Sequence, residues 1–338
     1  MTSPRRSRTF RPHRLSFTIA AALAITVASV AAAQEDSQRP QRDAAAKEQT
    51  RDVPGFLLDN GRYITIDAPR RLWETVPQGI GPIGLNDHEQ IVGSYIDDRG
   101  VAHGFLLDRR RGRFIDIDVP GAPATQAEDI NNGGQIVGKY ARPGQDLGST
   151  TLRGFLLDRG RFIRLDFPGA QQTIAHGINA RGQVVGEYTD RAGRIHGFFW
   201  TRGRFTAIDG PARGNETTAL NRINDRGQML GIFGPPDVRA RGFVSSSGMS
   251  TPFAFPGARF TIAYGLNNRG QIVGVATNQN PNLPTEVQAF ILAKGIGGPF
   301  TPLDRPGRSI TVPFDINNRS QIVGVAINTP APSEATAP

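Results

Sequence analysis

The chain has 338 residues with 40 glycines, 25 prolines and no cysteine, which excludes disulfides, zinc–thiolate sites, thiol nucleophiles and lipid attachment through cysteine. The formal net charge is +9, but without residues 1–33 the chain keeps 34 basic and 30 acidic residues. The remaining excess is too small to indicate a nucleic-acid-binding surface, so we expect no nucleic acid among the partners.

The N-terminal segment combines basic and apolar residues in the order of an export signal. Five arginines precede an apolar, alanine-rich run from Leu15 to Ala33 that ends in three alanines. This order predicts a signal peptide over residues 1–33, cleaved near Ala33. An uncleaved anchor is the alternative, because a run of this length just spans a bilayer. We expect a secreted or periplasmic protein with no membrane association after signal cleavage.

Two further segments lack any hydrophobic periodicity. Residues 34–52 are polar and charged, and residues 328–338 are rich in proline and alanine. Such composition predicts a disordered linker and a disordered tail around a folded region that covers residues 53–327.

A unit recurs six times in the folded region, at intervals of 43–50 residues. Its clearest part reads Gln, two apolar residues and Gly, as in Gln90–Gly93, and an Asn stands four positions before each Gln. The six asparagines are Asn86, Asn131, Asn179, Asn224, Asn267 and Asn317. A second part opens with Gly-Phe in five units and Ala289-Phe290 in the sixth, and it leads to a segment that usually ends in Asp. Repeats at this period indicate a propeller or a solenoid.

Each unit predicts four short strands, because strand-length apolar runs are separated by Gly, Asn and Pro. In the third unit they run over about residues 173–178, 183–189, 195–200 and 204–209. The Asn-x-x-Gly between the first two strands is typical of a tight turn, in which Gly adopts a positive φ. Glu89 and Ser320 replace this Gly in the first and last units, so those turns must differ in shape or carry strain.

The two ends of the repeat region hold complementary half-units. The region opens with third and fourth strands only, over residues 55–58 and 63–67, and closes with first and second strands only, over residues 310–316 and 321–326. We therefore predict an all-β fold, a six-bladed β-propeller of four-stranded blades with one blade shared between the N- and C-terminal segments. Sharing a blade removes exposed sheet edges. An open solenoid is the alternative, but it gives the complementary halves no purpose.

These motifs resemble a family known as the HAF extracellular repeat. Its pattern is similar to I-N-x-x-G-Q-I-V-G, followed by H-G-F-L and F-T-x-I-D-x-P-G-A, and the resemblance covers about residues 53–327. It implies an exported bacterial protein of propeller-like fold with no established activity, and it offers no catalytic residues. Arg153 and Arg241 depart from the pattern where His103 and His196 stand in other units.

The longer loops at one end of the ring are the preferred binding surface, because variable loops on a rigid scaffold tend to carry binding residues. The longest predicted connection, residues 67–86, contains Arg70, Arg71, Trp73 and Glu74. Trp73 is one of two tryptophans and offers a stacking surface for a sugar or a partner's side chain; the alternative is that it plugs the ring. Other long connections run over residues 141–152, 234–240 and 275–288.

The innermost strands bring further polar residues to the predicted axis. Two positions before the repeat Asn stand Asp129, Arg222 and Asp315, with glycines in the other units, and His176 lies beside one of these glycines. The two aspartates are candidates for a cation site or an acid–base pair. The alternative is that they pair with Arg222 or contact channel water. We include all four as candidate binding residues.

No motif of an enzyme class stands out in the sequence. There is no G-x-S-x-G, no phosphate-binding loop and no histidine pair at metal spacing. We predict a binding or interaction module for carbohydrate or a cell-surface protein at the loop end, and we expect it to be a monomer. An extracellular hydrolase or lyase acting on a polymer at the channel mouth is the alternative. No cofactor is indicated. Asp97, Asp98 and Asp190 are the alternative as calcium ligands, but they lack the spacing of a calcium loop and are more typical of turns.

Overall fold

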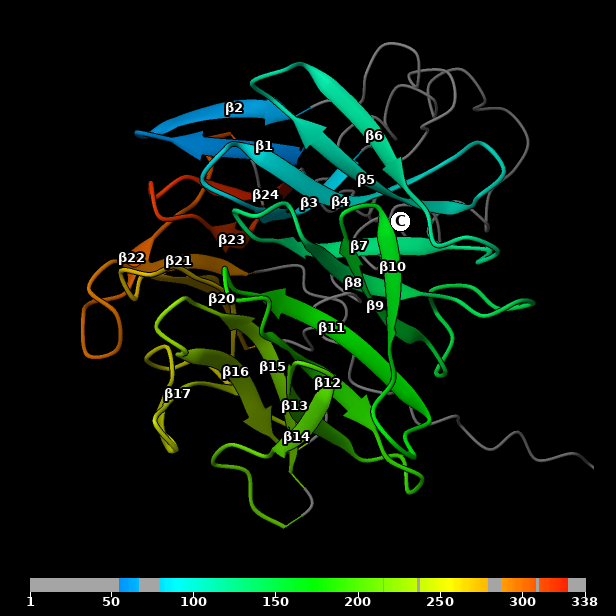
Figure 1. Ribbon diagram of the computed structural model, residues 1–338. Helices are drawn as coiled ribbons and strands as arrows, with labels where there is room; N and C mark the ends of the chain where they lie inside the picture. Colours follow the sequence, from blue (N-terminus) through cyan, green and yellow to red (C-terminus); the bar gives the residue numbers. More distant parts are fainter. Residues whose placement is uncertain are drawn as a thin grey trace, which may run out of the picture.

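The computed structural model describes residues 55–66, 80–214, 216–235, 238–278, 287–307 and 310–327. These residues form six four-stranded antiparallel sheets that lie side by side around a common axis (Figure 1). The architecture is a six-bladed β-propeller, as the repeat predicted.

Five blades are continuous in sequence. Blade 1 consists of β3 (Ile80–Leu85), β4 (Gln90–Ile96), β5 (Ala102–Asp108) and β6 (Arg113–Ile117). Blade 2 consists of β7 (Thr125–Ile130), β8 (Ile136–Tyr140), β9 (Arg153–Asp158) and β10 (Arg161–Leu165). Blade 3 consists of β11 (Gln172–Ile178), β12 (Val184–Thr189), β13 (Ile195–Thr201) and β14 (Arg204–Ile208). Blade 4 consists of β15 (Thr217–Ile223), β16 (Met229–Gly234), β17 (Arg241–Ser246) and β18 (Met249–Phe253). Blade 5 consists of β19 (Phe260–Leu266), β20 (Ile272–Thr277), β21 (Gln288–Leu292) and β22 (Thr301–Pro302).

Blade 6 joins the two ends of the repeat region. Its strand order is β23 (Ile310–Ile316), β24 (Ile322–Ile327), β1 (Gly55–Asp59) and β2 (Arg62–Ile66). Strands β1 and β24 pair in antiparallel register, with Leu57 opposite Val323. The prediction of a shared blade is therefore confirmed, and the open solenoid is wrong.

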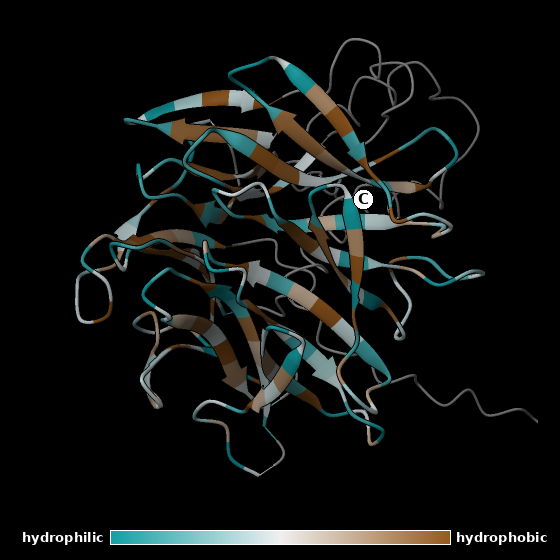
Figure 2. Cartoon of the chain, viewed as in Figure 1, coloured by the Kyte–Doolittle hydropathy of each residue, from teal (hydrophilic) through white to brown (hydrophobic). Residues whose placement is uncertain are grey.

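The repeated glycine and phenylalanine pack on each other within each blade. The Gly of the second strand lies beneath the Phe ring of the third, so that a Cβ on Gly186 would lie 2.8 Å from Phe198. The six Phe rings are almost fully buried, and burying each contributes about 1.5–3 kcal/mol. The equivalent rings are Phe56, Phe105, Phe155, Phe198, Phe243 and Phe290. Figure 2 shows hydrophobic residues along the strands and hydrophilic residues at many of the turns.

The repeat asparagines join each blade to the next. Each Asn side-chain amide donates to the backbone carbonyl of the next blade's Asn over 2.9–3.2 Å, and the ring of bonds closes from Asn317 to Asn86. The same Nδ2 donates to the Gln four residues later, while Oδ1 accepts backbone N–H groups of its own turn, as in Asn179. The Asn-x-x-x-Gln spacing is thus explained by closure of the ring.

The turns in blades 1 and 6 keep the shape of the glycine turns. Glu89 has φ 60° and Ser320 has φ 61°, close to the 68–79° of the glycines at the equivalent positions. Of the two alternatives left by the sequence, the strained one is correct. Both side chains bond here: Glu89 pairs with Arg109 at 3.1 Å, and Ser320 donates to Gln271 at 2.6 Å.

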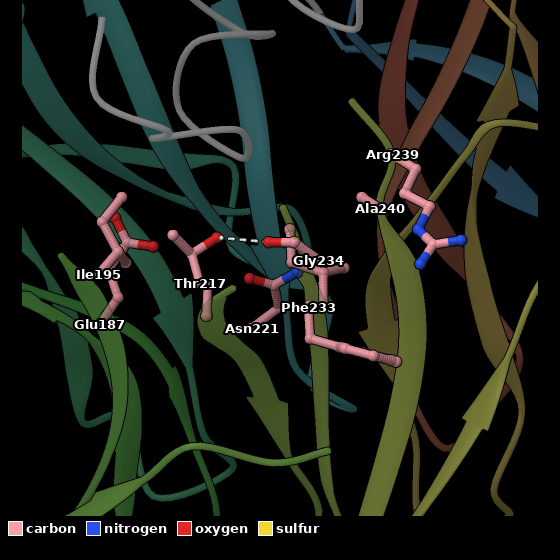
Figure 3. A pocket seen from close by; sticks show the side chains of 10 residues that line it. Glu187, Ile195, Thr217, Asn221, Phe233, Gly234, Arg239 and Ala240 are labelled. Carbon is pink, nitrogen blue, oxygen red and sulfur yellow. Dashed lines mark hydrogen bonds between the residues drawn. The ribbon is translucent and has the colours of Figure 1, made fainter. Parts of the chain in front are cut away.

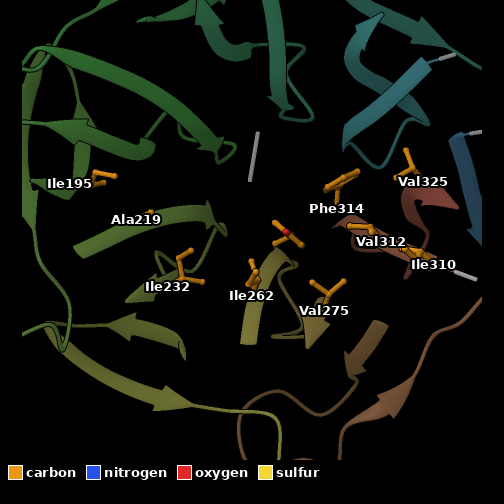
Figure 4. Packing of buried hydrophobic residues seen from close by; sticks show 10 residues of the cluster. Ile195, Ala219, Ile232, Ile262, Val275, Ile310, Val312, Phe314 and Val325 are labelled. Carbon is orange, nitrogen blue, oxygen red and sulfur yellow. The ribbon is translucent and has the colours of Figure 1, made fainter. Parts of the chain in front are cut away.

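Near the axis, the core is apolar on one side only. In blades 3–6 a cluster that includes Ile232, Ile262, Val312 and Phe314 packs around the centre (Figure 4). At the positions that correspond to Ile232 and Phe314, blades 2 and 3 carry ionisable side chains instead.

Candidate functional site

A β-bulge in every innermost strand directs the axial side chains. The register shifts by one residue in β3, β7, β11, β15, β19 and β23, always just before the position that carries Asp129, Arg222 or Asp315. The extra residue in β7 is Glu128 and in β11 it is His176. Bulges re-aim side chains, so the extra residue and the residue that follows it can both turn their side chains toward the centre of the ring.

Arg222 closes the axis. Its guanidinium Nε lies 3.2 Å from the Asp315 carboxylate across the ring, and the Arg222 side chain is only 7% exposed. The other nitrogens donate to backbone carbonyls of four innermost strands. These acceptors are Ile83 at 3.1 Å, Glu128 at 3.4 Å, His176 at 2.8 Å and Asn221 at 2.9 Å. One side chain therefore bonds strands of five blades. The glycine at the equivalent position of β11 lets the neighbouring strand approach closely, since a Cβ on Gly177 would lie 2.8 Å from the Cα of Arg222.

Backbone N–H groups hold both aspartates, and Arg222 pairs with Asp315. Asp315 accepts the Leu85 N–H at 3.0 Å, and Asp129 accepts the Ile178 N–H at 2.8 Å, so each carboxylate bridges to another blade. Burial raises the pKa of Asp129 to about 7; Arg222 opposes this shift and Asp315 adds to it. The arrangement is a buried cluster of two acids and one base, which matches the pairing alternative of the sequence analysis for Asp315.

His176 has partners that the sequence did not reveal. Its two ring nitrogens lie 3.8 Å from Glu128 and 3.7 Å from Glu187, and Lys139 lies 3.0 Å from the other oxygen of Glu128. All four side chains are almost fully buried. Burial opposes the imidazolium, but the two glutamates outweigh it and raise the pKa of His176. Lys139 and His176 overcome the effect of burial on Glu128 and lower its pKa to about 2.

This buried cluster has almost no free space beside it. The adjoining cavity, of about 20 Å³, lies between blades 3 and 4 and is lined by residues that include Glu187, Thr217 and Asn221 (Figure 3). Such a volume holds a water molecule and nothing larger. A second pocket, of about 70 Å³, lies at the mouth formed by the Asn turns, with Asp129, Arg222 and Asp315 among its lining residues. Neither space admits a polymer.

A larger pocket, with a volume of about 590 Å³, lies at the loop end of blade 4. It is lined by the connection before β17, which the sequence had singled out, and by the connection between β18 and β19. Arg239, Arg241 and Arg259 supply its charged groups. Its apolar faces are formed by Val238, Pro252, Phe253, Phe255 and Pro256. Volumes of about 300–1,000 Å³ are usual for ligand sites.

Backbone bonds hold the two walls of this pocket together. Ala240 forms an isolated bridge with Phe260, and the Thr261 N–H donates to the Ala240 carbonyl at 2.9 Å. Arg259 donates to the Val238 carbonyl at 3.0 Å, and the Thr261 hydroxyl accepts the Phe255 N–H at 2.9 Å. These bonds fix the positions of the described residues of the two walls relative to each other.

The other candidate residues and the possible metal ligands contribute no site among the described residues. Arg70, Arg71, Trp73 and Glu74 lie outside the described residues. Asp97 and the equivalent Asp190 accept backbone N–H groups of their own turns. In the described part of the chain, no group of three or more His, Asp or Glu side chains is placed to hold a metal ion. Nor does any helix there have the length and apolar character to cross a membrane.

Comparison with known proteins supports the fold and goes no further. No family model matches the chain, and no curated protein matches it in sequence. A solved structure described as TolB from Agrobacterium tumefaciens is similar with a TM-score of 0.56 at 10% identity, over 83% of this chain and 99% of that one. TolB from Acinetobacter baumannii is similar with a TM-score of 0.51 at 12% identity, over 83% of this chain but only 65% of that chain. At these identities the likeness establishes a propeller and leaves the activity open.

Proposed function

We propose that the protein is an exported binding module that recognises carbohydrate through the loop-end pocket of blade 4. The observation that carries the proposal is the pocket itself, about 590 Å³ in volume and lined by arginines and by aromatic and proline faces. Sugars offer apolar C–H faces and polar groups together, and such mixed walls suit them. In this proposal, residues 1–33 serve as the export signal and the chain belongs to the HAF repeat family.

The axis gives the alternative of a polymer-cleaving enzyme little support. Arg222 fills the centre, and the groups with perturbed pKa values, Asp129, Glu128 and His176, are nearly fully buried. A general acid or base must come within hydrogen-bond reach of its substrate. The small spaces beside these groups provide no such access.

A glycan array with the protein purified after export tests the proposal. We expect binding to a restricted set of glycans, lost in Arg239→Ala and kept in Trp73→Ala, because Arg239 lines the pocket. Loss in Trp73→Ala alone would move the site to residues 67–86. An array without signal, from protein that circular dichroism shows to be folded, would overturn the carbohydrate proposal.

A further inference from the structure

Blades 1–3 share a pair of one basic and one acidic side chain at their loop end. A basic residue at the first or second position of the third strand contacts an Asp that follows the fourth strand. His103 lies 2.9 Å from Asp118 and His196 lies 2.7 Å from Asp209. Arg153 lies 3.4 Å from Asp166. In all three blades, the hairpin register places the basic side chain and the carboxylate opposite each other.

Blade 4 keeps the basic residue and lacks the acid. Gly242 pairs with Phe253, so the same register places Arg241 opposite Ala254. Blades 1 and 3 have a second acid near the histidine, Asp97 or Asp190, and Pro235 stands at the equivalent place in blade 4. Blade 5 shows the reverse, with Gln288 opposite Asp304. Among the blades described at these positions, blade 4 alone presents the cation without its carboxylate.

The place of the missing carboxylate coincides with the large pocket. Arg241 and Ala254 both line it, and Arg241 is exposed there. A guanidinium binds a carboxylate through two parallel hydrogen bonds, which favours this group over a neutral hydroxyl. Arg239 and Arg259 add positive charge beside it, while Phe253 and Phe255 supply apolar faces.

We infer that the blade 4 pocket takes the carboxylate of an acidic sugar, which pairs with Arg241 in the way that aspartates of the chain pair with the equivalent basic side chains in blades 1–3. This inference rests on the proposed function and names its ligand class, a uronic acid. The apolar faces beside the arginines favour a sugar ring over an acidic peptide, whose flexible side chains offer no such surface.

Calorimetric titration of the full protein with trigalacturonate tests the inference. We expect Arg241→Gln to lower the affinity at least tenfold. We expect Ala254→Asp to do the same, because the new carboxylate restores the pair of blades 1–3 and occupies Arg241. The matched control is Arg153→Gln, which removes the equivalent cation of blade 2, whose partner is Asp166, and should leave the affinity unchanged.

Two further titrations separate the possible failures. The carboxyl-reduced trisaccharide should bind at least tenfold more weakly than trigalacturonate; equal binding, unaffected by Arg241→Gln, would overturn the carboxylate inference and leave carbohydrate binding intact. Tighter binding of triglutamate would overturn the sugar assignment. If neither trisaccharide binds and a glycan array gives no signal, the proposed function itself is overturned. Ala254→Asp should melt no lower than the parent, which shows that a lost affinity is not a lost fold.

Discussion

Replacing Arg222 by Met should destabilise the propeller strongly and in a pH-dependent way. The change removes the partner of Asp315 and the donor to four backbone carbonyls while keeping most of the side-chain volume. Breaking one partner of a buried ion pair costs about 3–5 kcal/mol, and the lost carbonyl bonds place the expected loss at the upper end. Arg222 is the charge that opposes the rise in the pKa of Asp129, so without it this pKa rises further and the loss grows with pH.

Chemical denaturation of the parent and the variant at pH 5 and pH 8 measures this effect. The Asp315→Asn change in the Arg222→Met background should recover about 1–3 kcal/mol, because an amide replaces an uncompensated buried charge. A loss below about 1 kcal/mol that is the same at both pH values would refute the idea that Arg222 holds the blades together.

Three other changes follow from the same structure. Asn179→Ala removes four hydrogen bonds and should cost about 3 kcal/mol in urea denaturation, against under about 1 kcal/mol for the exposed Asn132→Ala; equal losses would contradict the closure role of the ring. Deletion of β23 and β24 leaves β1 and β2 without a sheet and should abolish the cooperative melting transition, whereas an intact transition would show that the blades are independent. The raised pKa values of His176 and Asp129 mean that the folded state binds more protons than the unfolded state, so unfolding free energy should fall from pH 5 to pH 9; a rise over this range would contradict the assignment.

The repeat made the fold predictable. Half-units at the two ends specify the shared blade, and the pairing of Leu57 with Val323 follows once the ring closes. The four-strand pattern was also right within a residue or two, as in β12, which begins at Val184 because the Gln183 N–H bonds the Asn179 side chain. Strand periodicity and turn chemistry are local signals, and six copies make them reliable.

The site was less accessible from the sequence. Periodicity gives no sign of a β-bulge, so it could not place His176 between Glu128 and Glu187, two glutamates on different strands. A usable signal did exist, since the residue after the repeat Gly is charged in blades 2 and 3, as Lys139 and Glu187, and not in the others. The substitution of Ala254 for the repeat Asp opposite Arg241 was likewise readable once the hairpin register was known.

The most direct test of the account is to observe the side chain of Arg241 as ligand binds. In an NMR titration of the protein with trigalacturonate, the Nε–Hε signal of Arg241 should shift and saturate with the sugar. The signal of Arg153, already paired with Asp166, should stay in place. Saturable shifts that appear instead among the Asn turns at the opposite end of the ring, with Arg241 unchanged, would contradict the assignment of the loop end of blade 4 as the binding surface.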